Sequence, residues 1–250
     1  MAFRWMLLPL MVLLLLGGVM PVLAQGGDLT YGDEVEGEIT SLEQADLWKF
    51  EGAAGDVLIV LLTRDAVDSS LNPLVDILAE GEEVLATDDG VLSVEVGVVL
   101  PTDGTYTIRV RPRPNSTEVG TYTLRLIQPP TVVLGEPVEG LVTTDIPTYY
   151  LLTGQEAVEI TYTLGDDDFA PEVALTEIAT DSNVEIVGLG FLRALAVISG
   201  GSLRYGTLGL ADLDPDANYI LTVRRSLGTF IFGGPVEVDY SLTVSEFVPK

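Results

Sequence analysis

The sequence predicts an all-β protein, built from two tandem antiparallel β-sandwich domains that follow an N-terminal signal peptide. Three observations predict this fold class. One pattern of residues occurs twice in the same order, apolar and polar residues alternate over short segments, and turn-forming residues separate those segments. Few segments have the period of a helix, and only the run 191–198 stays ambiguous between helix and strand. We therefore expect short strands at regular spacing in both halves.

The first element is a leader over residues 1–24. Arg4 precedes an apolar run over residues 6–16, then helix-breaking glycines and a proline follow, and the small residue Ala24 ends the segment. This order is typical of a secretory signal peptide that is cleaved after Ala24. The alternative is an uncleaved membrane anchor, because about 20 apolar residues are enough to span a bilayer.

Next comes the internal repeat. The segment 32–37 (Gly-Asp-Glu-Val-Glu-Gly) recurs at 135–140 as Gly-Glu-Pro-Val-Glu-Gly. Three further matches follow in the same order: the aromatic pair Trp48 and Phe50 with Tyr149 and Tyr150, segment 100–106 with 213–219, and Tyr122-Thr-Leu with Tyr240-Ser-Leu. This order predicts two homologous domains, over residues 27–128 and 131–248.

Each copy has the alternation of a half-buried strand. In residues 105–110, Tyr106, Ile108 and Val110 fall on one face, and residues 121–127 repeat the arrangement. The runs 57–62 and 94–100 are aliphatic and β-branched, which favours strands in the core. Between the copies, Pro129-Pro130 cannot join the interior of a sheet and favours a stiff, extended connector.

Composition excludes several classes of function. The chain has 12 basic and 38 acidic residues and a net charge of -26, so its surface repels nucleic acid and anionic membranes. It contains no cysteine and no histidine, which excludes disulfides, a Ser-His-Asp or Cys-His site and an ordinary zinc site. A pair of carboxylates is the remaining catalytic alternative. Because the aspartates fall where turns are expected, we predict that the chain is not an enzyme.

A family resemblance adds to this interpretation. The motifs that carry it, in order, are Asp46-Leu-Trp48-Lys-Phe50, Asn72-Pro73-Leu74, Asp88-Asp89-Gly90, Asp103-Gly104-Thr105-Tyr106 and Gly120-Thr121-Tyr122-Thr123-Leu124. Over residues 29–128 the chain resembles the bacterial pre-peptidase C-terminal domain. Over 132–248 the resemblance is weaker, since Asp-Gly-Thr-Tyr has become Asp216-Ala-Asn-Tyr219. The resemblance implies a jelly-roll type of β-sandwich that acts as an accessory or binding unit of exported proteins.

Calcium is the metal that the acidic residues favour, because it takes several oxygen ligands from turns. The resemblance implies a candidate site at Asp46, Asp88 and Asp89. A weaker candidate is Asp212, Asp214 and Asp216, which alternate along the chain and could project oxygens to one side. A third acidic cluster occupies residues 166–168. The alternative is that all of them are solvated turn residues.

An arginine stripe is the least expected feature. Arg109, Arg111 and Arg113 occupy every second position, facing away from the predicted core, and Arg125 belongs to a following strand. Guanidinium groups suit carboxylates, so the stripe predicts a binding surface for an anionic partner. The alternative is local pairing with acidic residues across neighbouring strands.

Together these observations predict an exported, non-catalytic accessory or binding protein, secreted or at the cell surface, or periplasmic in a cell with an outer membrane. We expect adhesion or spacing at an extracellular polysaccharide or protein, with Ca²⁺ as a possible stabiliser, no other cofactor, and no nucleic-acid or membrane partner after cleavage. The alternative function is an in-trans regulator, inhibitor or chaperone of a secreted peptidase. The oligomeric state does not follow from the sequence.

Overall fold

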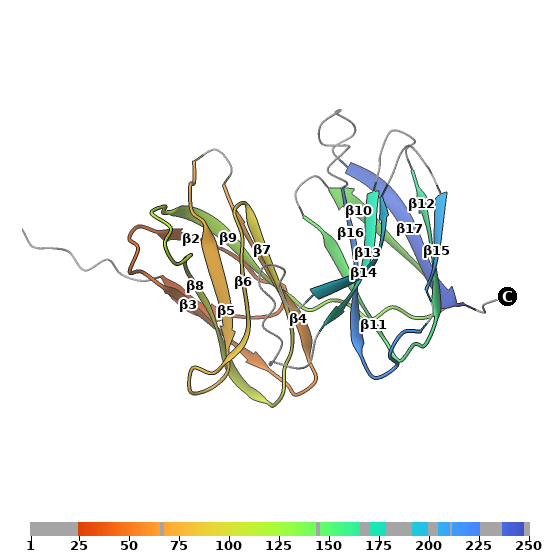
Figure 1. Cartoon of the computed structure of the whole chain (residues 1–250), viewed down its shortest axis with the longest axis horizontal. Coiled ribbons are helices and arrows are strands. Elements are labelled where there is room, and N and C mark those ends of the chain that lie inside the picture. Colours follow the sequence, from red (N-terminus) through yellow and green to blue (C-terminus); the bar gives the residue numbers. More distant parts are fainter. Residues whose placement is uncertain are drawn as a thin grey trace, which may run out of the picture.

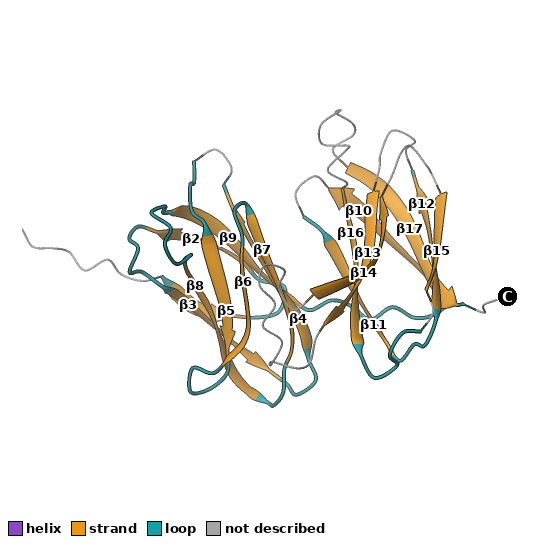
Figure 2. Cartoon of the chain, in the orientation of Figure 1, coloured by secondary structure: helices purple, strands orange, loops and turns teal. Residues whose placement is uncertain are grey.

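The computed structural model describes residues 25–65, 68–143, 146–165, 171–178, 192–199, 205–210, 212–225 and 237–247. Within these ranges every regular element is a β-strand, as Figure 2 shows. The predicted all-β class is therefore confirmed, and residues 192–198 of the ambiguous run belong to a strand, Leu192–Ser199. The predicted leader and the acidic cluster 166–168 lie outside the described residues.

The first half of the chain forms one sandwich of two sheets (Figure 1). Its strands are β1 (Gly26–Leu29), β2 (Glu34–Ile39), β3 (Asp46–Gly52), β4 (Val57–Arg64), β5 (Pro73–Leu78), β6 (Val84–Asp89), β7 (Ser93–Val99), β8 (Gly104–Pro112) and β9 (Gly120–Ile127). Sheet 1 has the order β1-β3-β8-β5-β6, and sheet 2 has the order β2-β9-β4-β7. Neighbouring strands are antiparallel, as predicted, except β1 and β3, which are parallel.

The second half forms a second sandwich. Its strands are β10 (Pro137–Thr143), β11 (Thr148–Thr153), β12 (Val158–Leu164), β13 (Pro171–Ile178), β14 (Leu192–Ser199), β15 (Tyr205–Leu210), β16 (Asn218–Arg225) and β17 (Glu237–Glu246). Sheet 3 has the order β11-β16-β13-β14, and sheet 4 has the order β10-β17-β12-β15. These orders repeat those of β3-β8-β5-β6 and β2-β9-β4-β7 strand for strand, which confirms that the fold is duplicated.

Each sandwich has its own apolar interior. In the first, alternate residues of the strands point between sheets 1 and 2, among them the fully buried Ile77, Ile108 and Leu124. In the second, Ile160, Leu221 and Leu242 are equally buried between sheets 3 and 4. The predicted alternation therefore holds in both copies.

A glycine and a tyrosine explain the repeated motifs. Gly37 pairs with Tyr122 across β2 and β9, and Gly140 pairs with Tyr240 across β10 and β17. A Cβ atom at Gly37 would lie 2.2 Å from Tyr122 Cζ, and one at Gly140 would lie 2.5 Å from Tyr240 Oη. Only glycine leaves room for the ring in each copy, so these motifs serve packing.

The predicted match of the aromatic pairs is wrong in one respect. Tyr150 points into the second interior, where its hydroxyl lies 2.6 Å from that of Tyr240. Trp48 occupies the corresponding place in the first, donating from Nε1 to the Tyr122 hydroxyl at 3.0 Å. Tyr149 instead points out of the second sandwich, because successive residues of a strand face opposite sides.

A third apolar cluster lies between the two sandwiches. Val57 and Ile59 of β4 point outward from sheet 2 and pack against residues that point outward from sheet 3: Tyr149, Ile178 and Ile220. Ile59 and Ile220 are completely buried, and Val99, Ile127 and Leu151 border the cluster. The two halves are thus docked face to face, which the sequence analysis did not predict.

The connector is part of this arrangement. Pro129 is buried and Pro130 is exposed, and the backbone N–H of Leu151 donates to the carbonyl oxygen of Pro130 at 2.9 Å. Thr131 then forms a parallel bridge with Leu151 of β11, in the place that β1 has beside β3. The Pro129-Pro130 junction therefore lies between two sandwiches and is held by the second one. The predicted boundaries 27–128 and 131–248 remain predictions.

Candidate binding surfaces

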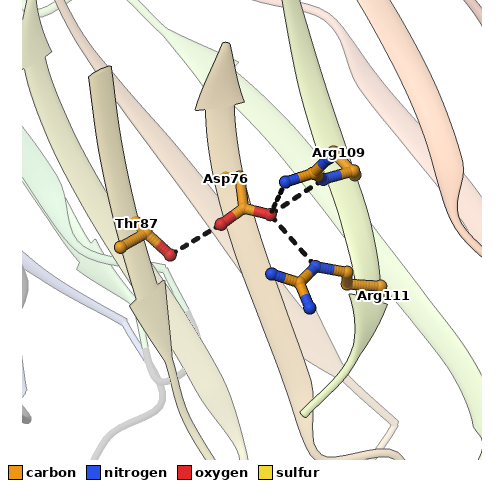
Figure 3. A network of polar contacts seen from close by, with 4 residues as sticks. All are labelled: Asp76, Thr87, Arg109 and Arg111. Carbon is orange, nitrogen blue, oxygen red and sulfur yellow. Dashed lines mark hydrogen bonds and ion pairs between the residues drawn. The ribbon is translucent and has the colours of Figure 1, made fainter. Parts of the chain in front are cut away.

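Three of the four predicted arginines come together on the outer side of sheet 1. Asp76 of β5 lies at their centre and is only 2% exposed, although it points away from the apolar interior. Its Oδ2 accepts hydrogen bonds from Arg109 Nε at 2.9 Å and from Arg111 Nε at 3.1 Å, and Arg109 Nη2 lies 2.8 Å away. Its Oδ1 accepts from Thr87 Oγ1 at 2.7 Å (Figure 3). Asp76 therefore orients both guanidinium groups.

Strand register explains why these side chains meet. Arg109 pairs with Asp76 across β8 and β5, and Asp76 pairs with Thr87 across β5 and β6. Residues that are directly opposite point to the same side of a sheet, so the three form one row. Two arginines share one carboxylate, and no described residue bonds the terminal nitrogens of Arg111.

Two further cations extend this surface. Arg113 follows β8 and pairs with Asp89 at 3.1 Å, with half of its side chain exposed. Lys49 of β3 is exposed on the same side, and the sequence analysis missed it, although its alternation with the buried Trp48 and Phe50 shows which way it points. We call Lys49, Arg109, Arg111 and Arg113 the cationic face. The carboxylates on the same side are Asp28, Glu51, Asp76 and Asp89. Positive and negative side chains are therefore equal in number on this side of sheet 1, although the chain as a whole has a net charge of -26.

Arg125 does not join the cationic face. It lies on β9 in sheet 2, across the sandwich from β8, and its Nε donates to Glu34 at 2.6 Å. β8 belongs to sheet 1 and β9 belongs to sheet 2, so β9 follows β8 in the chain without pairing with it. Anion binding by Arg109, Arg111, Arg113 and Arg125 stays a prediction.

The structure does not bring Asp46 together with Asp88 and Asp89. Asp46 of β3 aligns with Val110, Val75 and Asp88 in one row across sheet 1, three strand spacings long. At about 4.8 Å per spacing this is about 14 Å, too far for one ion. The expected convergence of these three carboxylates is therefore wrong.

Asp46 has an internal role instead. It is completely buried. Its Oδ1 accepts from Gln44 Nε2 at 2.8 Å and from the backbone N–H of Gln25 at 2.7 Å, while its Oδ2 accepts from the Tyr122 hydroxyl at 2.7 Å. Burial and this hydrogen bond to Asp46 raise the pKa of Tyr122 above its ordinary value, so the hydroxyl remains a donor.

The second candidate set forms a turn before β16. The backbone N–H of Asp216 donates to Asp214 Oδ1 at 2.9 Å, and the Tyr219 hydroxyl accepts from the Asp214 N–H at 2.7 Å. The first sandwich has a similar corner, where the Tyr106 hydroxyl donates to the carbonyl oxygen of Thr102 at 2.6 Å. The repeated motif thus closes a turn. No group of three acidic side chains in the described ranges is arranged to hold a metal ion, and calcium binding stays a prediction.

Open grooves lie at matching places in the two sandwiches. The first, of about 750 Å³, crosses β2, β9 and the end of β4 on the outer side of sheet 2, and carboxylates line it. The second, of about 600 Å³, crosses β10, β17 and β12. Each includes the repeated glycine and tyrosine, so the pairing that serves the core also shapes the surface above it.

In the part of the chain that the structure describes, no helix is long and apolar enough to cross a bilayer.

Comparison with solved structures finds β-sandwich proteins. The pre-peptidase C-terminal domain of a collagenase from Bacillus anthracis is 13% identical, with a TM-score of 0.33 over 41% of this chain and 95% of that chain. A periplasmic inhibitor of g-type lysozyme from Aeromonas hydrophila is 14% identical, with a TM-score of 0.33 over 41% and 96%. A CBM22 tandem domain from Paenibacillus barcinonensis is 6% identical, with a TM-score of 0.25 over 80% and 82%.

The first of these is a domain of the family that residues 29–128 resemble. Neither the family models nor the curated proteins give a match to the chain.

Proposed function

We propose that the chain is an exported, non-catalytic binding protein that holds an anionic extracellular polysaccharide on its cationic face. It also acts as a spacer between that polymer and the surface or protein next to its second sandwich. The cationic face carries the proposal. The arginines there are already oriented by Asp76, and the terminal nitrogens of Arg111 have no bond to a described residue. Planar guanidinium groups bind carboxylates through paired hydrogen bonds, so a uronate-bearing polymer is the ligand chemistry that fits.

The rest of the molecule supports a spacer. Outward residues of sheets 2 and 3 are buried against one another, so the two sandwiches support each other as one body. A chain without histidine or cysteine lacks the usual nucleophile and base pairs, which supports a role without catalysis. The predicted leader supports export.

Binding to an acidic polysaccharide tests the proposal. We expect the purified protein to bind polygalacturonate, to bind more weakly as salt rises, and not to bind neutral dextran. Arg111→Ser should weaken binding about two- to fivefold, because an exposed ion pair contributes about 0.5–1 kcal/mol. Arg125→Ser is the matched control, since it removes the same charge from sheet 2. Equal effects of the two variants, or no binding to any acidic polymer tested, would reject the cationic face.

The second candidate function is regulation of a secreted peptidase in trans. The resemblance of residues 29–128 to the pre-peptidase C-terminal domain favours it. Co-purification from the source separates the two functions, because a regulator should be recovered with a peptidase and a polymer-binding protein with glycan or matrix.

A further inference from the structure

A carboxyl group lies in the contact between the two sandwiches. Glu95 belongs to β7, in which the buried Val94 and Val96 point into the first interior. Glu95 points the opposite way, out of sheet 2, and β7 contacts β13 of the second sandwich. The side chain is therefore half-buried where the two halves meet, beside an apolar cluster that includes Ile59 and Ile178.

The groups that surround Glu95 come from four other strands. Tyr149 of β11, Glu172 of β13 and Arg224 of β16 belong to the second sandwich, and Asp88 of β6 belongs to the first. Arg224 is already engaged, since its Nε donates to Glu172 Oε1 at 2.7 Å. Arg125 of β9 is also close to Tyr149, and it is bonded to Glu34. Arg224 and Arg125 are thus both bonded to other carboxylates.

This environment disfavours the charged form of Glu95. Burial raises the pKa of the carboxyl above its ordinary value, Arg224 and Tyr149 oppose the rise, and the charges of Asp88 and Glu172 add to it. Burial and the neighbouring Glu95 likewise raise the pKa of Tyr149, so its hydroxyl stays protonated in the same range. Parting the sandwiches would expose Glu95 to water and return its pKa toward the ordinary value.

We infer that Glu95 makes the docking of the two sandwiches depend on pH, so that they are held together in acid and loosen as the pH rises. In the docked state Glu95 keeps a proton that it releases in the undocked state over the range between the two pKa values. The contribution of Glu95 to the stability of the docked state is fully present below the ordinary pKa of glutamate, about 4.3, and is lost as the pH rises through the higher, docked value. Within that range the docking equilibrium changes about tenfold for each pH unit.

The connector limits this movement. The last strand of the first sandwich ends at Ile127, while Thr131 is held by β11 of the second. Loosening would therefore part the outward faces of sheets 2 and 3 and would leave both interiors intact. This goes beyond the proposed function, because a spacer that changes stiffness with pH does not depend on which polymer the cationic face holds.

Distance measurement between two labels tests the inference. The chain has no cysteine, so Glu80→Cys and Glu156→Cys, both in exposed turns, accept a donor and an acceptor dye at defined places in the two sandwiches. We expect the efficiency of fluorescence resonance energy transfer between the two dyes to fall as the pH rises from 4 to 8, while far-UV circular dichroism stays constant. The constant dichroism separates loosening from unfolding.

Two variants decide whether Glu95 is responsible. Glu95→Gln cannot lose a proton, so its transfer efficiency should stay at the acidic value across the whole range. Glu43→Gln removes the same charge from an exposed loop and should keep the pH dependence. The inference is overturned if Glu95→Gln and Glu43→Gln give the same profile, or if the unsubstituted labelled protein shows no change with pH.

Discussion

The contact between the sandwiches makes a prediction about Ile59. Its neighbours Leu58 and Val60 point into the first interior, whereas Ile59 is completely buried against Tyr149, Ile178 and Ile220 of the second sandwich. Ile59→Ala therefore removes apolar contact between the halves without touching either interior. Any loss of stability in this variant measures what docking contributes.

The size of the effect follows from the atoms removed. Ile59→Ala deletes three carbon atoms from a fully buried position, and at about 0.8 kcal/mol for each the transfer of these atoms is worth about 2.4 kcal/mol. Substitutions of this kind inside cores cost about 2–5 kcal/mol, the upper part of which reflects a cavity. Two docked surfaces can part and admit water, so we expect about 2–3 kcal/mol, at the low end of that range.

Urea unfolding measures it with two probes. Trp48 is the only tryptophan after the predicted leader, and it reports on the first sandwich, while far-UV circular dichroism reports on both. In Ile59→Ala the urea concentration at the midpoint of unfolding, followed by Trp48 fluorescence, should fall. Leu47→Ala is the control, because Leu47 is 44% exposed on sheet 1 and should cost less than about 0.5 kcal/mol. A loss in Ile59→Ala no larger than that of Leu47→Ala would refute the docked arrangement.

Three other variants or conditions test separate parts of the structure. Asp76→Asn removes the charge that Arg109 and Arg111 share, and a thermal melt should show a loss of about 1.5–3 kcal/mol; an unchanged melting temperature would show that Asp76 orients nothing. Gly37→Ala places a Cβ 2.2 Å from the Tyr122 ring and should cost about 1–3 kcal/mol in urea, whereas Gly27→Ala, with its nearest atom at 3.5 Å, should be nearly neutral; similar losses in both would contradict the packing argument. The predicted calcium site requires a higher melting temperature in calcium than in chelator, and equal values would end that hypothesis.

Much of the fold could be predicted because its determinants are local or repeated. Alternation along residues 105–110 reports directly which side chains face the interior, and the order of the repeated motifs reports that the fold occurs twice. The pairing of Gly37 with Tyr122 explains why both motifs recur together, since neither residue can change alone. Alternation within one strand and repetition along the chain can both be read directly from the order of the residues.

The sites were harder to predict because they depend on which strands become neighbours. Arg125 follows Arg111 closely in the chain, yet it lies in the other sheet, while Asp76, more than thirty residues earlier, lies beside Arg109. Asp46 and Asp88 are in the same sheet but three strands apart. Adjacency of strands is a property of the whole topology, and no local pattern reports it.

One signal for the docked surface was present in the sequence. The run Val57–Leu62 is apolar at every position, where a strand with one face in water would alternate as residues 105–110 do. A strand that is apolar on both sides is covered on both sides. The outward residues Val57 and Ile59 could therefore have been predicted to meet a second surface, although not which one.

Backbone ¹⁵N relaxation measured at acidic pH tests most directly whether the duplicated sandwiches form one body. Amides of both halves should report one common rotational correlation time, appropriate to the whole chain. Two different and shorter correlation times, one for each sandwich, would contradict the docked arrangement from which the spacer and the pH dependence both follow.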